Sequence, residues 1–335
     1  MKSLSFIGLF WFSVALAVVA SAAHAGTTLL NASYDVTREF YKDYNRLFAE
    51  HWKAETGEIV EVKQSHGGAS MQARAVADGL QADVVTFNQA TDINFLVDRG
   101  ELVGKDWSSR LPYGSAPLTS TIVFLVRKGN PKGIKDWSDL VKPGVTVIIP
   151  NPKTSGNGRY SYLAAWGYAL RQPGGTEASA RDFVSRLFRN VPVLDTGGRA
   201  ATTTFAQREL GDALVTFENE AYLTQKEFGT DSMEIVLPSI SILAEAPVAV
   251  VDKVVDKRGA RKQAEAYLRY LYSPEAQNLA ASHFFRPRLT EALEKHANIF
   301  KPIKTLTIDE IAGGWPNAQK LHFSDGGIFD QIYLH

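Results

Sequence analysis

The segment Asn-Pro-Lys-Thr-Ser-Gly-Asn-Gly-Arg at positions 151–159 has the residue types and spacing that point most clearly to chemistry. It follows a strand-like run, 145–149, and opens a helix-like run, 160–170. A loop that ends in Ser-Gly at a helix start turns a hydroxyl and several backbone N–H groups toward one point, because the first four N–H groups of a helix lack internal partners. The helix dipole adds partial positive charge there. Such a corner suits a small oxyanion and needs no lysine or arginine.

Two other interpretations of this segment compete with anion binding. A nucleotide P-loop places its lysine directly after the second glycine of Gly-x-x-x-x-Gly-Lys-Ser/Thr. Here Lys153 precedes Gly156, which disfavours nucleotide binding. The plainer interpretation is a structural strand–turn–helix corner in which Ser155 caps the helix. The segment alone does not separate that corner from an anion site.

Catalytic and metal chemistry find little support in the sequence. The chain has no cysteine and seven histidines, none of them in a metal-ligand spacing. A serine hydrolase that uses Ser155 is an alternative, but no Gly-x-Ser-x-Gly surrounds this serine. Glu218 and Glu220 lie two positions apart and therefore do not share a helix face. We expect a protein that is not an enzyme and that holds no metal or cofactor.

The first 25 residues have the pattern of a secretory signal peptide. Met1 and Lys2 precede an apolar stretch, 4–20, and Ala-His-Ala at 23–25 forms a cleavage site of the A-x-A kind. No later segment approaches the roughly 20 apolar residues of a transmembrane helix. We expect cleavage after Ala25 and export to the periplasm.

The charge and the composition narrow the class of partner. The formal net charge of the chain is zero, and it becomes about −1 when the signal peptide with its single lysine is removed. This balance argues against nucleic acid, whose binding rests on basic surface. Hydrophobic residues make up 45% of the chain, which allows the large core that an exported protein without disulfides needs. The mature chain of about 310 residues has the length of two domains.

Strand-like and helix-like runs alternate along the mature chain. The strand-like runs lie at 28–32, 58–63, 84–87, 145–149, 191–194 and 213–217, and helix-like runs follow them. This order predicts an α/β architecture with doubly wound sheets. In such sheets, ligands bind beyond the carboxyl ends of the strands, where the strand order reverses. Loops that carry Gly or Ser lie at those ends, at 33–35, 65–69, 154–157 and 196–198.

Two of these loops come early in the chain and two come late, so we expect two lobes that face one cleft. The chain is expected to cross between the lobes near 113–122 and to return near 238–248. The predicted division is a signal peptide at 1–25, lobe 1 at 26–117 with 242–285, lobe 2 at 118–241, and a C-terminal tail at 286–335 that packs on either lobe.

Together these segments resemble one protein family. Residues 151–159, with Ser-Tyr-Asp-Val-Thr-Arg-Glu at 33–39, Gln-Ser-His-Gly-Gly at 64–68 and Asp-Thr-Gly-Gly-Arg at 195–199, are similar to the periplasmic sulfate- and thiosulfate-binding proteins of bacterial ABC importers. The resemblance runs through essentially the whole mature chain. It implies a two-lobed periplasmic-binding-protein fold of the type II kind that closes on a dehydrated anion. It also implies a monomer that delivers sulfate or thiosulfate to the membrane permease subunits of an importer.

The resemblance further implies a site made of hydrogen-bond donors, with no counter-charge in contact with the anion. The implied donors are the backbone N–H groups of Asp35, Ala69, Gly156, Asn157 and Gly198 and the hydroxyl of Ser155. The carboxylate of Asp35 is then expected to point away from the anion, where it caps a helix or pairs with an arginine.

Phe217 departs from the sulfate-binding members, which place a tryptophan here and use its indole N–H. The thiosulfate-binding members resemble this chain in carrying phenylalanine, which offers no donor; a core residue at a strand end is the simpler explanation. Segments 86–89 and 201–204 are similar to the thiosulfate branch, whereas 166–170 and 241–245 are similar to the sulfate branch. The preference between the two anions therefore stays open, as does another oxyanion such as molybdate. A ferric-ion receptor is disfavoured, because the cleft loops offer small residues instead of clustered tyrosines or carboxylates.

Overall fold

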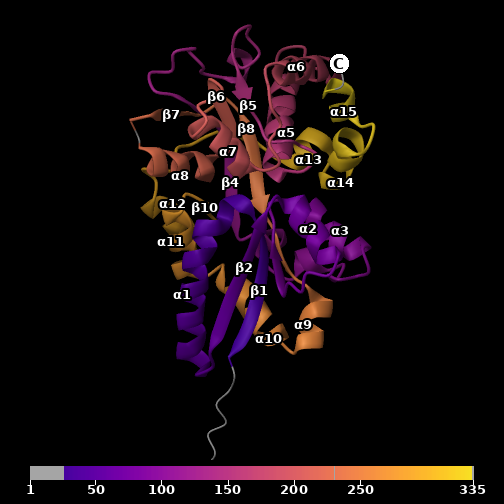
Figure 1. Ribbon diagram of the computed structural model, residues 1–335, viewed down its shortest axis with the longest axis vertical. Coiled ribbons are helices and arrows are strands. Elements are labelled where there is room, and N and C mark those ends of the chain that lie inside the picture. Colours follow the sequence, from indigo (N-terminus) through magenta and orange to yellow (C-terminus); the bar gives the residue numbers. More distant parts are fainter. Residues whose placement is uncertain (1–25, 230, 334–335) are drawn as a thin grey trace, which may run out of the picture.

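Figure 1 shows the computed structural model of the chain, which describes residues 26–229 and 231–333. The predicted signal peptide, 1–25, lies outside the described residues. Two β-sheets lie toward the two ends of the long axis of the molecule, and helices cover each of them (Figure 1). None of the helices in the described part of the chain combines the length and the apolar character of a membrane span.

The smaller sheet, within the described residues, has four strands in the order β2-β1-β3-β9. Its strands are β1 (Thr27–Tyr34), β2 (Val60–Gly67), β3 (Val84–Thr86) and β9 (Val248–Val250). β1 pairs in parallel with β2 and β3, and β9 joins β3 in the antiparallel direction. The register aligns Ser33 with both His66 and Thr86, so the loops after these three strands begin side by side.

The larger sheet has seven strands among the residues that the structure describes, with β11-β8-β4-β6-β5 as its main path and β7 and β10 also on β4. They are β4 (Leu118–Arg127), β5 (Val147–Ile148), β6 (Ala213–Phe217), β7 (Met233–Val236), β8 (Ser241–Ala246), β10 (Arg286–Pro287) and β11 (Thr305–Leu306). β5 and β6 are parallel, whereas β6, β7, β8 and β10 run antiparallel to β4. β4 is buried over nearly its whole length, in keeping with its unbroken apolar run at 122–126.

Helices follow most strands and cover the faces of both sheets. The longer ones are α1 (Arg38–Thr56), α2 (Ala69–Ala77), α3 (Ala90–Asp98), α5 (Gly156–Leu170), α6 (Glu177–Arg189), α7 (Gly198–Ala206), α8 (Glu218–Phe228), α10 (Arg261–Tyr270) and α11 (Pro274–Ser282). The shorter ones are α4 (Pro112–Ser115), α9 (Asp252–Arg258), α12 (Thr290–Lys295), α13 (Ile308–Ala312), α14 (Trp315–Ala318) and α15 (Ile328–Tyr333). Single turns of tighter or wider helix are η1 (Asp35–Thr37), η2 (Trp107–Ser109), η3 (Trp137–Asp139) and η4 (Gln319–Phe323).

The structure confirms the predicted two-lobed α/β fold. Both sheets are mixed, because β9 and β4 run against their neighbours. The two segments expected to cross between the lobes pair with each other, since 118–121 of β4 lie opposite 243–246 of β8. The C-terminal tail meets the larger sheet, where β11 pairs with β8 and α15 packs on α6. The residue boundaries of the lobes stay a prediction.

Aromatic residues at helical spacing attach α1 to the smaller sheet and its helices. Phe40, Tyr44, Phe48 and Trp52 are each at most 4% exposed. The rings of Tyr44 and Phe48 meet Tyr267 of α10, with centroids 5.0 and 5.2 Å apart. Burial of each such ring contributes roughly 1.5–3 kcal/mol. The aromatic spacing of this segment therefore belongs to the core and forms no ligand platform.

A buried hydrogen-bond network fixes the strands of the smaller sheet just before they reach the cleft. The hydroxyl of Tyr267 donates to Oδ1 of Asn45 (2.7 Å) and accepts from Nδ2 of Asn31 (3.2 Å). Oδ1 of Asn31 accepts from the hydroxyl of Thr86 (2.9 Å). These side chains come from α10, α1, β1 and β3, so the network sets two strand ends relative to the helices behind them.

Removal of the Tyr267 hydroxyl is expected to destabilise the fold. In Tyr267→Phe, the buried amides of Asn45 and Asn31 each lose a partner, and an unpaired buried polar group costs about 1–3 kcal/mol. The free energy of unfolding from urea denaturation should fall by about that amount. Tyr113→Phe is the matched control, because Tyr113 is 59% exposed, and it should change the free energy by less than about 0.5 kcal/mol. Equal stability of the two variants would contradict the role given to the network.

Candidate functional site

Loops from both sheets meet in the middle of the molecule. Gly68, just before α2, lies so close to the opposite loops that an added Cβ would stand 3.0 Å from the carbonyl oxygen of Thr154 and 3.3 Å from that of Thr196. A Cβ on Gly197 would stand 2.5 Å from a carboxylate oxygen of Asp35. The four loops singled out in the sequence therefore lie together, and their glycines permit the close approach.

The loop before α5 is organised by Asn151 and Ser155. Oδ1 of Asn151 accepts the N–H of Lys153 (2.9 Å), and its carbonyl oxygen accepts the N–H of Ser155 (2.9 Å). Ser155 is the N-cap of α5, and its hydroxyl oxygen accepts the N–H of Gly158 (3.4 Å). Because the hydroxyl is the acceptor in this bond, its own hydrogen stays available. Ser155 can therefore cap the helix and also donate to a ligand.

The backbone donors implied by the resemblance stand at the starts of helices. Ala69 begins α2, Gly156 and Asn157 begin α5, and Gly198 begins α7. Across residues 26–229 and 231–333, no protein acceptor takes the N–H groups of these four residues. Such N–H groups carry partial positive charge. The starts of α2, α5 and α7 thus place partial positive charge where the loops of the two sheets meet.

Asp35 begins η1 and turns its carboxylate toward α7 of the larger sheet. Oδ2 accepts the N–H of Arg199 (3.2 Å), so a carboxylate from one sheet caps a helix of the other. The Arg199 guanidinium pairs with Glu39 of α1 (2.9 Å) and lies 3.5 Å from Glu220. Burial raises the pKa of Asp35, against the opposing effect of Arg199, and burial raises the pKa of Glu220 to about 7. Burial thus opposes the ionised form of Glu220, while Arg199 favours it.

Phe217 ends β6 and is 1% exposed. Its ring makes edge contacts with Tyr34 (centroids 6.4 Å apart) and Tyr160 (5.6 Å). Together with Tyr34 and Asn88, it lines a small cavity of about 10 Å³, roughly the space of one water molecule. Asn88 also packs on Gly156, so the cavity borders the start of α5. Phe217 is thus a core residue and a wall of this space at once.

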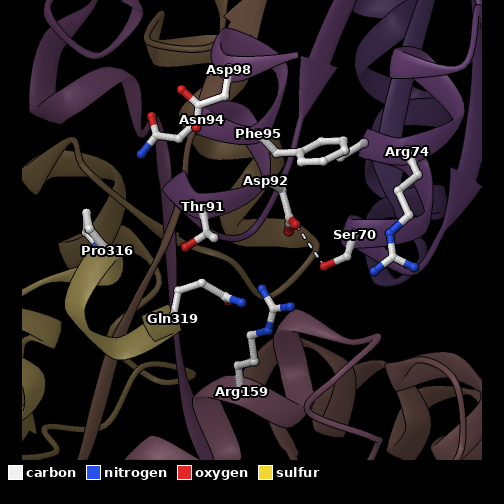
Figure 2. Close-up of a pocket in the computed structure, with 11 residues that line it drawn as sticks. Ser70, Arg74, Thr91, Asp92, Asn94, Phe95, Asp98, Arg159, Pro316 and Gln319 are labelled. Atoms are coloured by element: carbon white, nitrogen blue, oxygen red, sulfur yellow. Dashed lines mark hydrogen bonds between the residues drawn. The ribbon is translucent and has the colours of Figure 1, made fainter. Parts of the chain in front are cut away.

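A larger pocket, of about 500 Å³, opens beside the loops (Figure 2). It lies between α2 and α3 on one side and α5, α14 and η4 on the other, and its lining is Ser70, Ala73, Arg74, Thr91, Asp92, Asn94, Phe95, Asp98, Arg159, Pro316 and Gln319. Ser70 donates to Asp92 (2.7 Å) across this wall, as Figure 2 shows. Arg159 faces them from the other side, and burial lowers its pKa. Groups of both signs share the pocket, and Arg159 is the lining residue that belongs to the 151–159 motif.

The C-terminal tail supports the α5 loop from behind, which the sequence analysis missed. Nζ of Lys153 donates to Asp330 (2.9 Å) and to the carbonyl oxygen of Ser324 (3.2 Å). Nε of Arg159 donates to the carbonyl oxygen of Pro152 (2.9 Å) in the same loop. Lys153 and Asp330 are 177 positions apart, so no local pattern could have linked them.

Within the described residues, Ser155 has no partner that would make it a nucleophile. A serine nucleophile needs a histidine or another base that accepts its hydroxyl hydrogen, and none of the described residues accepts it from Ser155, whose oxygen takes the N–H of Gly158. The described residues contain no group of three His, Asp or Glu side chains placed to hold a metal ion. The available chemistry is a set of uncharged donors around a small space. Such a set suits an anion that only accepts hydrogen bonds.

Several known proteins are similar to this chain in sequence. The family model described as bacterial extracellular solute-binding protein matches residues 33–286. The thiosulfate-binding protein of Pseudomonas aeruginosa is 61% identical over 312 residues, which cover 93% of this chain and 94% of that protein. The sulfate-binding protein of Escherichia coli K12 is 57% identical over 304 residues, which cover 91% of this chain and 92% of that protein.

A solved structure extends the similarity to the fold. The sulfate-binding protein SubI from Mycobacterium tuberculosis H37Rv matches with a TM-score of 0.80 at 33% identity, over 88% of this chain and 98% of SubI. Sequence and fold therefore agree over most of the chain, including all four cleft loops. The chain belongs to the sulfate- and thiosulfate-binding family of the bacterial extracellular solute-binding proteins, as its loop motifs indicate.

Proposed function

We propose that this chain is a receptor that binds sulfate and thiosulfate between its two sheets and delivers the anion to an ABC importer. The observation that supports the proposal is that the loops before three helix starts lie against one another, with the Ser155 hydroxyl buried among them. The relatives at 61% and 57% identity are named for these two anions. Molybdate is the alternative cargo, because it too is an oxyanion that only accepts hydrogen bonds.

In the proposed complex, every contact to the anion is a donor. The donors are the backbone N–H groups of Asp35, Ala69, Gly156, Asn157 and Gly198 and the hydroxyl of Ser155. Loops of the smaller sheet contribute Asp35 and Ala69, and loops of the larger sheet contribute the others. Phe217 adds an apolar wall. No lysine or arginine head group belongs to the set, so the anion is stabilised by dipoles and not by an ion pair.

The proposal places the protein in the periplasm. The signal peptide is removed after Ala25, and the mature chain acts as a monomer without catalytic activity. Membrane permease subunits of the importer receive the anion. Lobe 1, at 26–117 with 242–285, and lobe 2, at 118–241, open and close about the paired strands β4 and β8.

Titration calorimetry of the mature chain, 26–335, tests the proposed function. Saturable binding of both sulfate and thiosulfate is the expected result, with molybdate as a competitor of lower affinity. Binding of molybdate alone would favour the alternative cargo. Ester hydrolysis that disappears in Ser155→Ala would favour the hydrolase and would overturn the proposal.

Phosphate should compete poorly with sulfate at about pH 8. Monohydrogen phosphate carries a proton that needs an acceptor, and the proposed contacts are all donors. One phosphate O–H is then buried without a partner, at a cost of about 1–3 kcal/mol, which corresponds to roughly 5- to 150-fold weaker binding. Displacement of bound sulfate by phosphate measures this ratio. Equal affinity for the two anions would show that an acceptor lies in the site.

Ser155→Ala should weaken anion binding beyond its effect on stability. Loss of one hydrogen bond to a charged ligand costs about 1.5–3 kcal/mol, or roughly ten- to a hundredfold in dissociation constant. Thr176→Ala is the matched control, because Thr176 caps α6 in the same way, accepting the N–H of Ser179 (3.2 Å), far from the cleft loops. Both variants should lose about 1 kcal/mol of stability. An equal affinity in both variants would mean that Ser155 is only a cap.

Phe217→Trp should shift the preference toward sulfate. The indole N–H adds a donor that an oxygen uses better than the larger terminal sulfur of thiosulfate, so the ratio of the sulfate to the thiosulfate dissociation constant should fall by up to about tenfold. Calorimetry with both anions on parent and variant gives the ratio. The melting temperature of the ligand-free variant checks that the larger ring fits beside Tyr34 and Tyr160. An unchanged ratio in a stable variant would show that this position does not set the preference.

A further inference from the structure

Asn88 reaches from the smaller sheet to the start of α5. It follows β3, precedes α3, and is 5% exposed. A Cβ added to Gly156 would stand 2.0 Å from Oδ1 and 2.7 Å from Nδ2 of Asn88, so the amide lies directly against the Gly156 backbone. This contact joins a side chain of one sheet to a proposed ligand loop of the other.

The amide of Asn88 is an uncommitted polar group of the small cavity beside Phe217. Its Oδ1 is buried and has no hydrogen-bond partner among the described residues. Two of the hydroxyls that line the same cavity are engaged elsewhere, since Ser120 donates to Asn219 (2.9 Å) and Thr119 donates to the carbonyl oxygen of Arg286 (3.1 Å). A buried amide oxygen without a partner costs about 1–3 kcal/mol. Binding of a group that completes the hydrogen bonds of the Asn88 amide is therefore favoured beside this side chain.

The chemistry of that group follows from the neighbours of the amide. An asparagine side chain offers two N–H donors, and a half-turn about its last bond exchanges its nitrogen and oxygen. An anion in front of Gly156 accepts such a donor, and Phe217 on the same wall has none to give. The donor is uncharged, like the backbone donors of the proposed site.

We propose that Asn88 is a further ligand contact, whose side-chain NH₂ donates to bound sulfate or thiosulfate on the side where Phe217 presents its ring. This inference rests on the proposed function. Asn88 would give the smaller sheet a side-chain donor in addition to the N–H groups at the start of α2. It would also place a donor beside Phe217, whose ring has none. Sulfate and thiosulfate both present an oxygen to the amide, so both anions depend on it.

The test is calorimetry of Asn88→Ala and Asn88→Asp with sulfate and with thiosulfate at pH 8. Asn88→Ala should weaken both anions by about ten- to a hundredfold. Asn88→Asp keeps the shape but replaces the donor with a negative charge, so it should weaken them further. Asn278→Ala is the control, because Asn278 also has a buried Oδ1 without a partner but lies on α11, away from the loops. It should bind both anions as the parent does.

A pH series separates a ligand contact from a packing role against Gly156. As the pH falls from 8 to 5, the new carboxyl of Asn88→Asp becomes protonated and regains a donor. The ratio of its sulfate affinity to that of the parent, both measured at the same pH, should therefore increase as the pH falls. The comparison with the parent removes the contribution of Glu220, whose pKa is about 7. Unchanged binding in Asn88→Ala, or a loss in Asn88→Asp that does not recover, overturns the inference. Failure of the parent to bind either anion overturns the proposed function instead.

Discussion

An anion that leaves water for an enclosed site must replace the hydrogen bonds of its hydration shell, because a buried charge without partners is among the most costly groups in a protein. Helix starts have the opposite need, since their first N–H groups lack internal acceptors. In this fold, α2, α5 and α7 begin in the same enclosed region, and the N–H groups there have no protein acceptor among the described residues. The proposed anion and the helix starts satisfy each other. The rest of the structure serves to bring these starts together and to keep them there.

The charged groups near the loops stand behind them. Lys153 extends to Asp330 of the C-terminal tail, Arg159 donates to a carbonyl oxygen of the loop, and Arg199 pairs with Glu39. Each cation is engaged outside the proposed donor set but lies within a few residues of it. In the proposed complex, direct contact with the anion is left to neutral donors. An anion held in this way is not tied to any single charged side chain.

The sequence analysis reached the fold and the meeting of the loops, because strand–loop–helix alternation and Gly- or Ser-bearing strand ends are local patterns. It did not reach strand direction: the apolar runs of β4 and β9 predict burial equally well for either direction. It also missed Asn88, because a lone asparagine after a strand is typical of a turn residue. Its contact with Gly156 joins segments that are distant in the chain, and only packing of the two sheets creates it. Patterns within a segment are thus readable, whereas partners between segments need the fold.

Division of the donors between two sheets gives the proposed receptor a direct route to release its cargo. Separation of the lobes moves the N–H groups of α2 away from those of α5 and α7, so the proposed anion loses part of its donors and is hydrated again. No ion pair to the anion has to break. The bonds that join the sheets in the protein itself include the one from the Arg199 N–H to Asp35 and the pair of Arg199 with Glu39. Such bonds contribute roughly 0.5–1.5 kcal/mol each, whereas each donor to a charged ligand contributes about 1.5–3 kcal/mol. A ligand shifts such an equilibrium only by its differential affinity for the two states. In the proposed complex, each donor to the anion therefore adds more to closure than one of these bonds does, and an importer that separates the lobes competes with hydrogen bonds and not with an ion pair to the anion.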